Sequence, residues 1–272
     1  MPADEDGAAS LYVREAGSGS TVLLLHGLGS DHTVWNGILP VLAEEHTVLA
    51  PDLRGHGRSP TPEGSTFGFD EMEADLEQLL AERKASPVHV VGLSAGAFLA
   101  TRLAVDRTSQ LRSLVSIAGA SHCDAHTRAV AENWARTYHE AGFELYVQRL
   151  LRDVYSPGWL EGHMDLVDKV TRQLRDVDLR GPLQWYSAIR SFDVRGSLGR
   201  LRLPTLVVHG MDDRVIDPTH ARLLRQSILG AELKLYPYAG HMVPVEQGEE
   251  TGRLLKDWLS RVDAVAAKAP PG

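Results

Sequence analysis

The sequence predicts an α/β protein with a mostly parallel central sheet, and two observations carry that prediction. Short apolar runs rich in valine and leucine alternate with longer stretches of helical spacing, and several runs, such as "TVLLLH" and "TLVVHG", stay apolar without alternation. Continuous apolar runs are typical of strands that are covered on both faces. Strands separated by helices indicate a parallel sheet with right-handed crossovers. The expected strands are Leu11–Arg14, Thr21–His26, Thr47–Pro51, Val88–Gly92, Leu111–Ala118, Pro204–Gly210 and Glu232–Tyr236.

Four of the stretches between these runs carry apolar residues at the three- and four-residue spacing of one helix face. In a sheet of this kind ligands bind outside the carboxyl ends of the strands, so functional residues are expected just after the apolar runs. The predicted helices are Phe69–Arg83, Ala95–Val105, Thr219–Leu229 and Gly248–Val262.

One long segment breaks the alternation of strands and helices. From residue 121 to about residue 200 the sequence has helical spacing throughout and no convincing strand. We therefore expect a helical cap of residues 121–200, inserted into a core of residues 1–120 and 201–264. The C-terminal residues 265–272, rich in alanine and proline, are expected to form a disordered tail.

The predicted cap holds a dense share of the aromatic residues of the chain. Any one of them could simply pack the cap onto the core. Together they indicate a substrate pocket, because substrate sites that need no cofactor are mostly apolar with few polar groups. The residues expected to line this pocket are Trp35, Trp134, Tyr138, Trp159, Trp185 and Met242.

Composition and charge exclude several classes of partner. The 272 residues carry a net charge of −8 without a basic stripe, so neither nucleic acid nor an acidic membrane surface is expected to bind. Cys123 is the only cysteine, which excludes an intrachain disulfide and favours a reducing compartment. The acidic start "MPADEDGAAS" has no apolar centre, and no apolar run approaches 18 residues, so we expect a cytoplasmic protein. The oligomeric state cannot be read from the sequence.

The stretch Gly92-Leu93-Ser94-Ala95-Gly96 matches the pattern G-x-S-x-G. The match alone is weak, but it follows a predicted strand and opens a predicted helix, which is the context of a nucleophile elbow. Ser94 would then lie on a strained turn where the two backbones cross closely. Glycines at positions 92 and 96 remove the side chains that would clash there. The following helix would point its N-terminal amides towards a developing oxyanion.

Four blocks occur together in a recognisable order. "HGLGS" at 26–30 follows the second predicted strand, "PDLRGHGRS" fills 51–59, the elbow contains Ser94, and "VVHGMDDRVIDP" precedes "YAGHMVPVEQ" with its His241. With these blocks the chain resembles the α/β-hydrolase superfamily over about residues 11–262. The resemblance implies the α/β-hydrolase fold, with a helical cap inserted and no cofactor or metal.

The resemblance also implies a role for particular side chains. Ser94 would be the nucleophile, and His241 would take its proton and later return it to the leaving group. The acid that orients His241 would be Asp213, three residues after Gly210. The order serine, aspartate, histidine along the chain agrees with the triad of this fold. The acids that compete with Asp213 are Asp212, Asp217 and Asp124.

The oxyanion hole implied by the family consists of two backbone N–H groups, those of Leu28 and Ala95. Other polar residues in the four blocks have structural interpretations. His26 is expected to be a strand-end residue, and Asp52, Arg54 and His56 are expected to form a turn network. A loose cluster that could suggest a metal is interpreted instead as solvated cap residues: His122, Asp124, His126 and His139.

The branch that the sequence most resembles contains enol-lactonases and small carboxylesterases. The predicted reaction is hydrolysis of a carboxylic ester or lactone of a small or medium metabolite, through an acyl-enzyme intermediate and without a cofactor. The same triad could serve a C–C bond hydrolase, or an eliminating or acyl-transferring enzyme. Because fold does not fix function, a non-catalytic ligand-binding protein of this fold is a further alternative.

Overall fold

The computed structural model describes residues 10–61, 66–175 and 180–268. These residues form one seven-stranded sheet with the order β1-β3-β2-β4-β5-β6-β7, in which β1 is antiparallel to β3 and all other neighbours are parallel. The predicted α/β class and mostly parallel sheet are confirmed, and each expected strand is present within about two residues of its predicted ends. The strands are β1 Val13–Ala16, β2 Ser20–Leu25, β3 His46–Pro51, β4 Val88–Leu93, β5 Leu111–Ile117, β6 Thr205–Gly210 and β7 Glu232–Tyr236.

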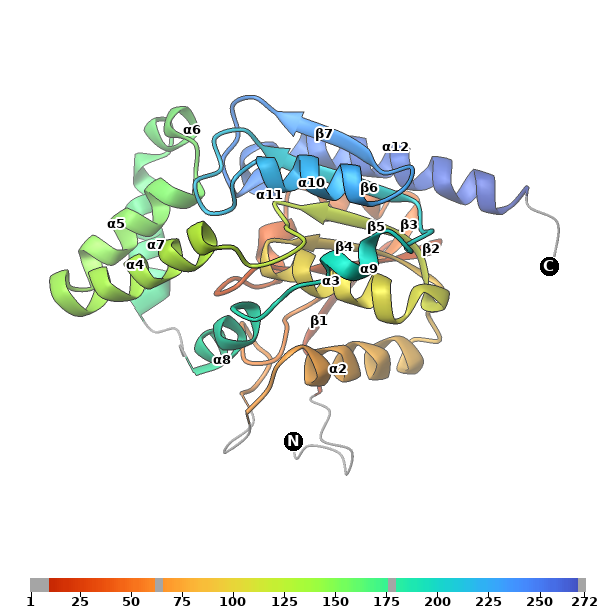
Figure 1. The fold of residues 1–272 in the computed structure, drawn as a ribbon, viewed down its shortest axis with the longest axis horizontal. Helices are drawn as coiled ribbons and strands as arrows, with labels where there is room; N and C mark the ends of the chain where they lie inside the picture. Colours follow the sequence, from red (N-terminus) through yellow and green to blue (C-terminus); the bar gives the residue numbers. More distant parts are fainter. Residues whose placement is uncertain (1–9, 62–65, 176–179, 269–272) are drawn as a thin grey trace.

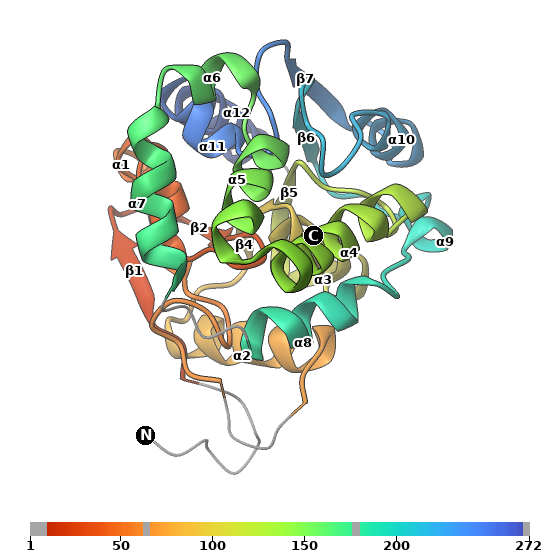
Figure 2. The ribbon, with the colours of Figure 1, turned by 90° about the vertical axis from the view of Figure 1, so that its left-hand side faces the viewer.

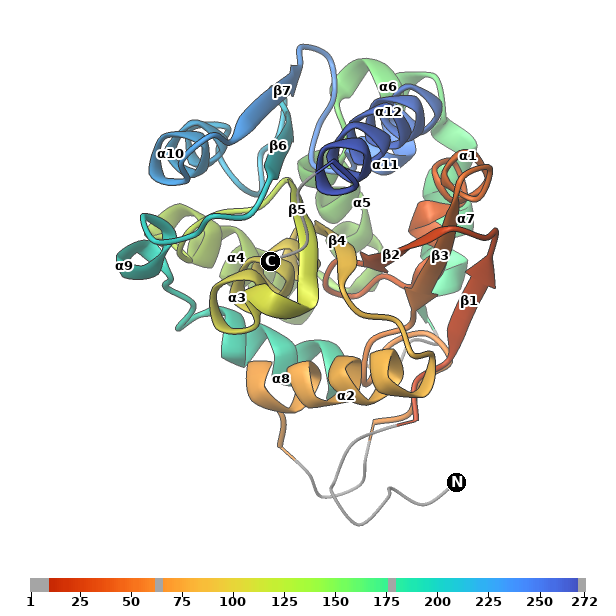
Figure 3. The ribbon, with the colours of Figure 1, turned by 90° about the vertical axis from the view of Figure 1, so that its right-hand side faces the viewer.

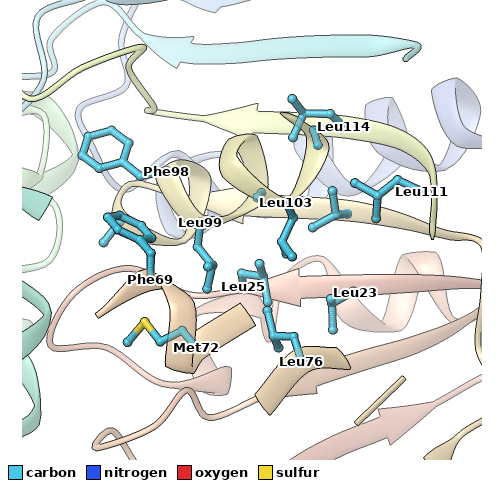
Figure 4. Packing of buried hydrophobic residues seen from close by; sticks show 14 of the residues in the cluster. Leu23, Leu25, Phe69, Met72, Leu76, Phe98, Leu99, Leu103, Leu111 and Leu114 are labelled. Atoms are coloured by element: carbon cyan, nitrogen blue, oxygen red, sulfur yellow. The ribbon is translucent and has the colours of Figure 1, made fainter. Parts of the chain in front are cut away.

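Helices cover both faces of the sheet, which explains why the central strands are apolar without alternation (Figures 1 and 3). On β2, Leu23 and Leu25 pack with the helices of one face, whereas Val22 and Leu24 pack with those of the other. The packing on the first face is seen in Figure 4, where Met72 and Leu76 approach the strand residues. The first face carries α2 Phe69–Glu82, α3 Ala95–Asp106 and α10 Thr219–Ser227, and the second carries α1 Leu39–Leu42 and α12 Gly248–Ala266.

The segment between β5 and β6 is helical, and most of it lies beyond one end of the sheet (Figures 1 and 2). Its last part returns to the core, because Trp185 and Phe192 are buried in the same cluster as α2 and α3. Phe192 stacks on Phe98 of α3, with ring centres 4.7 Å apart. The helices of this segment are α4 Ala125–Ala141, α5 Phe143–Val154, α6 Pro157–Glu161, α7 Met164–Arg175, α8 Arg180–Ile189 and α9 Arg195–Leu198.

Short helical turns complete the described elements. They are η1 His32–Trp35, η2 Thr108–Gln110 and α11 Val243–Glu246. No helix among residues 10–61, 66–175 and 180–268 has both the length and the apolar character needed to cross a membrane.

The C-terminal helix is longer than the sequence pattern predicted. α12 continues to Ala266, so the predicted start of a disordered tail at residue 265 is wrong. Alanine has the highest helix propensity, and the run "DAVAA" contains neither glycine nor proline to end the helix earlier. The last part of the predicted tail, residues 269–272, lies outside the described residues.

Candidate active site

Ser94 lies between β4 and α3 on a strained turn, with φ 54° and ψ −117°. Its backbone N–H donates to the carbonyl of Ile117 at 2.9 Å, which ties the turn to the neighbouring strand. A Cβ on Gly92 would lie 2.2 Å from the carbonyl oxygen of Gly96, and a Cβ on Gly96 would lie 2.2 Å from that of Leu25. Only glycine fits at either position, so the predicted steric basis of the elbow is confirmed.

His241 and Asp213 lie on the loops that follow β7 and β6, and they form a buried pair. The Nδ1 of His241 is 2.8 Å from Oδ2 of Asp213. Asp213 Oδ1 accepts hydrogen bonds from the N–H groups of Val215 at 2.8 Å and Ile216 at 2.9 Å. Burial alone would raise the pKa of Asp213, but the imidazoles of His241 and His209 outweigh that effect and hold the pKa below its usual range. Asp213 is therefore ionised, and Nδ1 of His241 donates to it.

A second imidazole contacts this acid, and the sequence analysis did not predict it. Nε2 of His209, in β6, lies 3.0 Å from Oδ2 of Asp213 and 2.9 Å from the carbonyl oxygen of Ile216. One N–H thus faces two acceptors, which fixes the ring of His209 and the loop that carries Asp213. The only signal in the sequence is its position next to Gly210, at the end of an apolar run.

None of the three competing acids takes the place of Asp213, and two of them are held in other interactions. Asp124 caps α4 by accepting from Thr127 N–H at 2.8 Å, and its other oxygen lies 3.2 Å from Nε2 of His220. Asp217 accepts from the N–H of Thr219 at 2.8 Å. Within the described ranges, no hydrogen bond joins the carboxylate of Asp212 to His241, and the buried partner of His241 is Asp213.

Ser94 and His241 line the same cavity, which has a volume of about 760 Å³. The cavity lies between the carboxyl ends of the strands and the helices of the inserted segment, and Leu28, Ala95 and Met242 also line it. In the part of the chain that is described, no hydrogen bond connects Ser94 to His241. Bonds of this kind in enzymes without ligand are often long and tighten when substrate binds.

The turn at residues 26–30 lies directly against the elbow. A Cβ on Gly27 would lie 3.3 Å from Cβ of Ser94. The buried ring of His26 anchors this turn, because its Nε2 accepts from Leu53 N–H at 2.9 Å while Nδ1 donates to the carbonyl of Gly27 at 2.8 Å. Among the residues described, no protein group accepts a hydrogen bond from the N–H of Leu28. Ala95 begins α3, so its N–H has no partner within the helix.

Four of the six aromatic and methionine residues predicted to line the pocket lie elsewhere. Trp35 and Trp185 are both fully buried in the core, and Trp185 packs its edge against the rings of His26 and His56. Trp159 stacks between Tyr155 and His163, and Tyr138 is 41% exposed. Aromatic content showed that side chains pack in this region but carried no information on the direction in which each one points.

Trp134 lines the cavity, and its Nε1 donates to Asp153 at 2.7 Å. The rest of the cap wall is mostly aliphatic but also includes Tyr155, Lys169 and Tyr186, and Val215, Ile216 and Val245 of the core complete the lining. The other cap residues on this wall that the sequence did not single out include Leu150, Leu151, Val154, Leu166, Val170 and Ile189.

A cluster of two aspartates and a histidine after β2 and β3 holds turns together. Oδ1 of Asp52 accepts from the backbone N–H of His32 at 2.8 Å and from the ring Nδ1 of His32 at 2.7 Å. Oδ2 of Asp52 accepts from the N–H of Arg58 at 2.8 Å. Asp31, His32 and Asp52 present ligand atoms close enough together for a metal ion. Their oxygens, however, are taken by hydrogen bonds within the protein, including that from Thr33 N–H to Asp31 at 2.8 Å. This cluster therefore fits a turn network better than a metal site.

A buried carboxylate connects the loop of His241 to the cap. Oε1 of Glu246 accepts from the N–H of Gly240 at 3.0 Å, and its Oε2 accepts from that of Ser156 at 3.1 Å. Met242 N–H donates to the carbonyl of Val154 at 3.1 Å, so two hydrogen bonds, this one and that from Ser156 to Glu246, join the two segments. Burial raises the pKa of Glu246. The side chain of Glu246 thus ties the loop that carries His241 to the cap.

We expect Glu246→Gln to lower both the melting temperature and the turnover rate. Glutamine offers one acceptor oxygen where glutamate offers two, so one buried N–H loses its partner at a cost of about 1–3 kcal/mol. Calorimetry and ester turnover measure the two effects. Glu249→Gln is the matched control, because Glu249 is exposed and, in the described part of the chain, its one ion pair is with Arg253 at the surface. Equal melting temperatures for wild type and Glu246→Gln would contradict this role.

Comparison with known proteins agrees with this geometry. A family model for the alpha/beta hydrolase fold matches residues 20–247. The chain belongs to the α/β-hydrolase fold family. Among curated members, "Putative carbamate hydrolase RutD" of Variovorax paradoxus is 30% identical over 257 residues, covering 92% of this chain and 96% of the relative.

Solved structures of α/β-hydrolases superpose closely on this chain. A hydrolase from Pseudomonas aeruginosa PA01 has a TM-score of 0.84 and 27% identity, covering 95% of this chain and 97% of that one. The enol-lactonase of Burkholderia xenovorans LB400 has a TM-score of 0.81 and 22% identity, covering 92% and 96%. At that identity, the likeness to the enol-lactonase concerns the fold alone.

Proposed function

We propose that this α/β-hydrolase cleaves a carboxylic ester or lactone of a small or medium metabolite, through an acyl-enzyme intermediate on Ser94. The observation that carries the proposal is the pair of Asp213 and His241, 2.8 Å apart and buried, beside a cavity that the strained Ser94 also lines. A hydroxyl in that conformation has no structural purpose that alanine or glycine could not serve. The relatives and neighbours named as hydrolases support a hydrolytic reaction.

In the proposed mechanism, Oγ of Ser94 attacks the substrate carbonyl carbon while Nε2 of His241 takes its proton. Asp213 holds the ring through Nδ1 and stabilises the imidazolium that forms. The N–H groups of Leu28 and Ala95 stabilise the negative oxygen of the tetrahedral intermediate, and losing one such donor typically costs about 3 kcal/mol of transition-state stabilisation.

Collapse of the tetrahedral intermediate completes the first half of the reaction. The carbon–oxygen bond to the alcohol breaks, and His241 gives its proton to the departing oxygen. A water molecule, deprotonated by His241, then attacks the acyl group on Ser94. The acid is released and the serine hydroxyl is restored. The 760 Å³ cavity lies within the size range of small-molecule sites.

A carbamate is a second candidate substrate, and one observation favours it. The curated relative from Variovorax paradoxus carries the name of a carbamate hydrolase and covers almost the whole chain. The proposed nucleophile and oxyanion donors would serve a carbamate carbonyl as well as an ester carbonyl. We expect the carbamate to react more slowly, because donation from its nitrogen makes the carbonyl carbon less electrophilic.

A pair of substrates of equal length separates the two candidates. We expect purified protein to hydrolyse p-nitrophenyl butyrate at least about 10-fold faster than p-nitrophenyl N-ethylcarbamate, as measured by release of p-nitrophenol. Faster turnover of the carbamate would show that the carbamate, and not the ester, is the preferred substrate class. Turnover of neither compound would contradict the proposed function. A cytoplasmic location belongs to the same proposal, and the lone, buried thiol of Cys123 supports it.

A further inference from the structure

Charged side chains are rare in the cavity wall, and they lie on different parts of it. Besides His241, the ionisable groups are Asp31, Lys169 and two tyrosines. Burial raises the pKa of Tyr155 to about 12 and also raises that of Tyr186, so both phenols are neutral at physiological pH. Asp31 belongs to the loop after β2, in the core, whereas Lys169 belongs to α7 of the cap. Among the described residues, Lys169 is the one basic side chain, lysine or arginine, in the cavity wall.

The ammonium of Lys169 forms no ion pair with the rest of the described protein. Two acids close to it on α7, Asp165 and Asp168, form no ion pair with it, and no other carboxylate does so anywhere in the described ranges. By contrast, Lys234 lies 3.2 Å from Glu250 and Lys256 lies 2.8 Å from Glu44. An unpaired ammonium at the wall of the cavity is available to a ligand.

The negative net charge of the chain makes the positive charge of Lys169 important for the binding of an anion. At a net charge of −8, the general field of the protein disfavours the approach of an anion. A cation at the wall of an otherwise mostly apolar cavity adds a local attraction for an anion and would favour one orientation of an acidic ligand. Asp31 adds repulsion on the core side, where its Oδ1 is held by the N–H of Thr33 at 2.8 Å. Both charges therefore direct an acidic group towards the cap.

We propose that Lys169 makes the enzyme selective for substrates that carry a carboxylate, or a similar acidic group, at the end remote from the scissile carbonyl. The proposal rests on the proposed function and adds a substrate class to it. The carbonyl would lie at Ser94 and the acidic group at α7. Because Lys169 is exposed, its ammonium stays hydrated and the contribution is moderate, as for other solvated ion pairs.

Two esters that differ only in a terminal group test the selectivity. Mono-p-nitrophenyl glutarate and p-nitrophenyl pentanoate have acyl chains of equal length, and only the first ends in a carboxylate. We expect Lys169→Met to lower kcat/KM for the glutarate ester about 3- to 10-fold, mainly through KM, and to change that of the pentanoate ester less than about 2-fold. Lys169→Arg should retain most of the preference. In wild type, 0.5 M NaCl should reduce the preference for the glutarate ester, since salt screens exposed charges.

The matched control, Arg172→Met, removes a positive charge that lies on the same helix but outside the cavity wall. Arg172 lies one turn further along α7, is exposed and does not line the cavity. Arg172→Met should leave the ratio of the two kcat/KM values unchanged. Equal losses for both esters in Lys169→Met would overturn the proposal. So would an equal loss of preference in Lys169→Met and Arg172→Met.

A binding measurement separates this proposal from the proposed function. Calorimetry of Ser94→Ala with monomethyl glutarate and with methyl pentanoate needs no turnover, and only the first of these ligands carries a carboxylate. We expect monomethyl glutarate to bind more tightly than methyl pentanoate, and Lys169→Met in the same background to abolish the difference. If wild type hydrolyses neither p-nitrophenyl ester but this difference is present, the proposed reaction fails and the anion selectivity stands. Equal binding of the two methyl esters would overturn the selectivity even where ester turnover is rapid.

Discussion

Replacing Ser94 by alanine is expected to lower kcat for a short aryl ester by at least ~1000-fold, with little change in stability. The variant loses the nucleophile, so the residual rate comes from the oxyanion donors and from binding alone. Alanine fits the same backbone, because the strain at φ 54° arises from the turn and not from the hydroxyl. Turnover and circular dichroism of the same preparation measure the two quantities.

A second buried serine provides the control for this variant. Ser116 lies in β5, next to the strand that leads to Ser94. Its Oγ has no hydrogen-bond partner among the residues that the structure describes, and it does not line the cavity. Ser116→Ala makes the same chemical change and is expected to leave turnover within about 2-fold of wild type. A Ser94→Ala protein as active as Ser116→Ala would remove Ser94 from the mechanism.

Replacing Asp213 by asparagine is expected to have the second large effect, a fall in kcat on the order of 1000-fold or more. The amide oxygen can keep the hydrogen bonds from Val215 and Ile216, which preserves the loop. The amide N–H₂ would then face Nδ1 of His241 and favour the wrong tautomer, which leaves Nε2 protonated and unable to act as a base. The loss should thus be mainly in kcat, with a lower melting temperature as well, because the amide N–H₂ also replaces the oxygen that faces Nε2 of His209.

Asp212 offers an isosteric control one residue away. Its backbone N–H donates to the carbonyl of Ala239 at 2.9 Å, an interaction that a change of side chain does not remove. Asp212→Asn is expected to change kcat less than about 3-fold. If Asp212→Asn lowered kcat as much as Asp213→Asn, the assignment of the acid to Asp213 would be wrong.

Much of the fold could be predicted because the physical requirements are local in sequence. A strand covered on both faces must be apolar at consecutive positions, and β2, β4 and β6 therefore stood out as uninterrupted runs. The elbow was equally legible: the contacts of 2.2 Å that a Cβ would make at Gly92 and Gly96 exclude every other residue type there. The resemblance to the family, which places an acid three residues after Gly210, implied that Asp213 pairs with His241.

The features that the sequence did not reveal depend on side-chain direction across elements far apart in the chain. Trp35 and Trp185 were expected in the pocket but point into the core, where their large apolar surfaces are removed from water. His209 and Glu246 act on the site through contacts that only the folded arrangement creates. The place of Lys169 on the cavity wall, without a carboxylate partner among the described residues, likewise depends on how α7 packs and is not visible in the sequence.

Chemical labelling tests the central claim most directly. A fluorophosphonate reacts with a serine only when a base and an oxyanion site activate it, and the adduct can be located by mass spectrometry of peptides. We predict one stoichiometric adduct, on the peptide that contains Ser94, and strongly reduced labelling in Asp213→Asn. An adduct on a different residue, or full ester turnover by a protein that the reagent leaves unlabelled, would contradict the account.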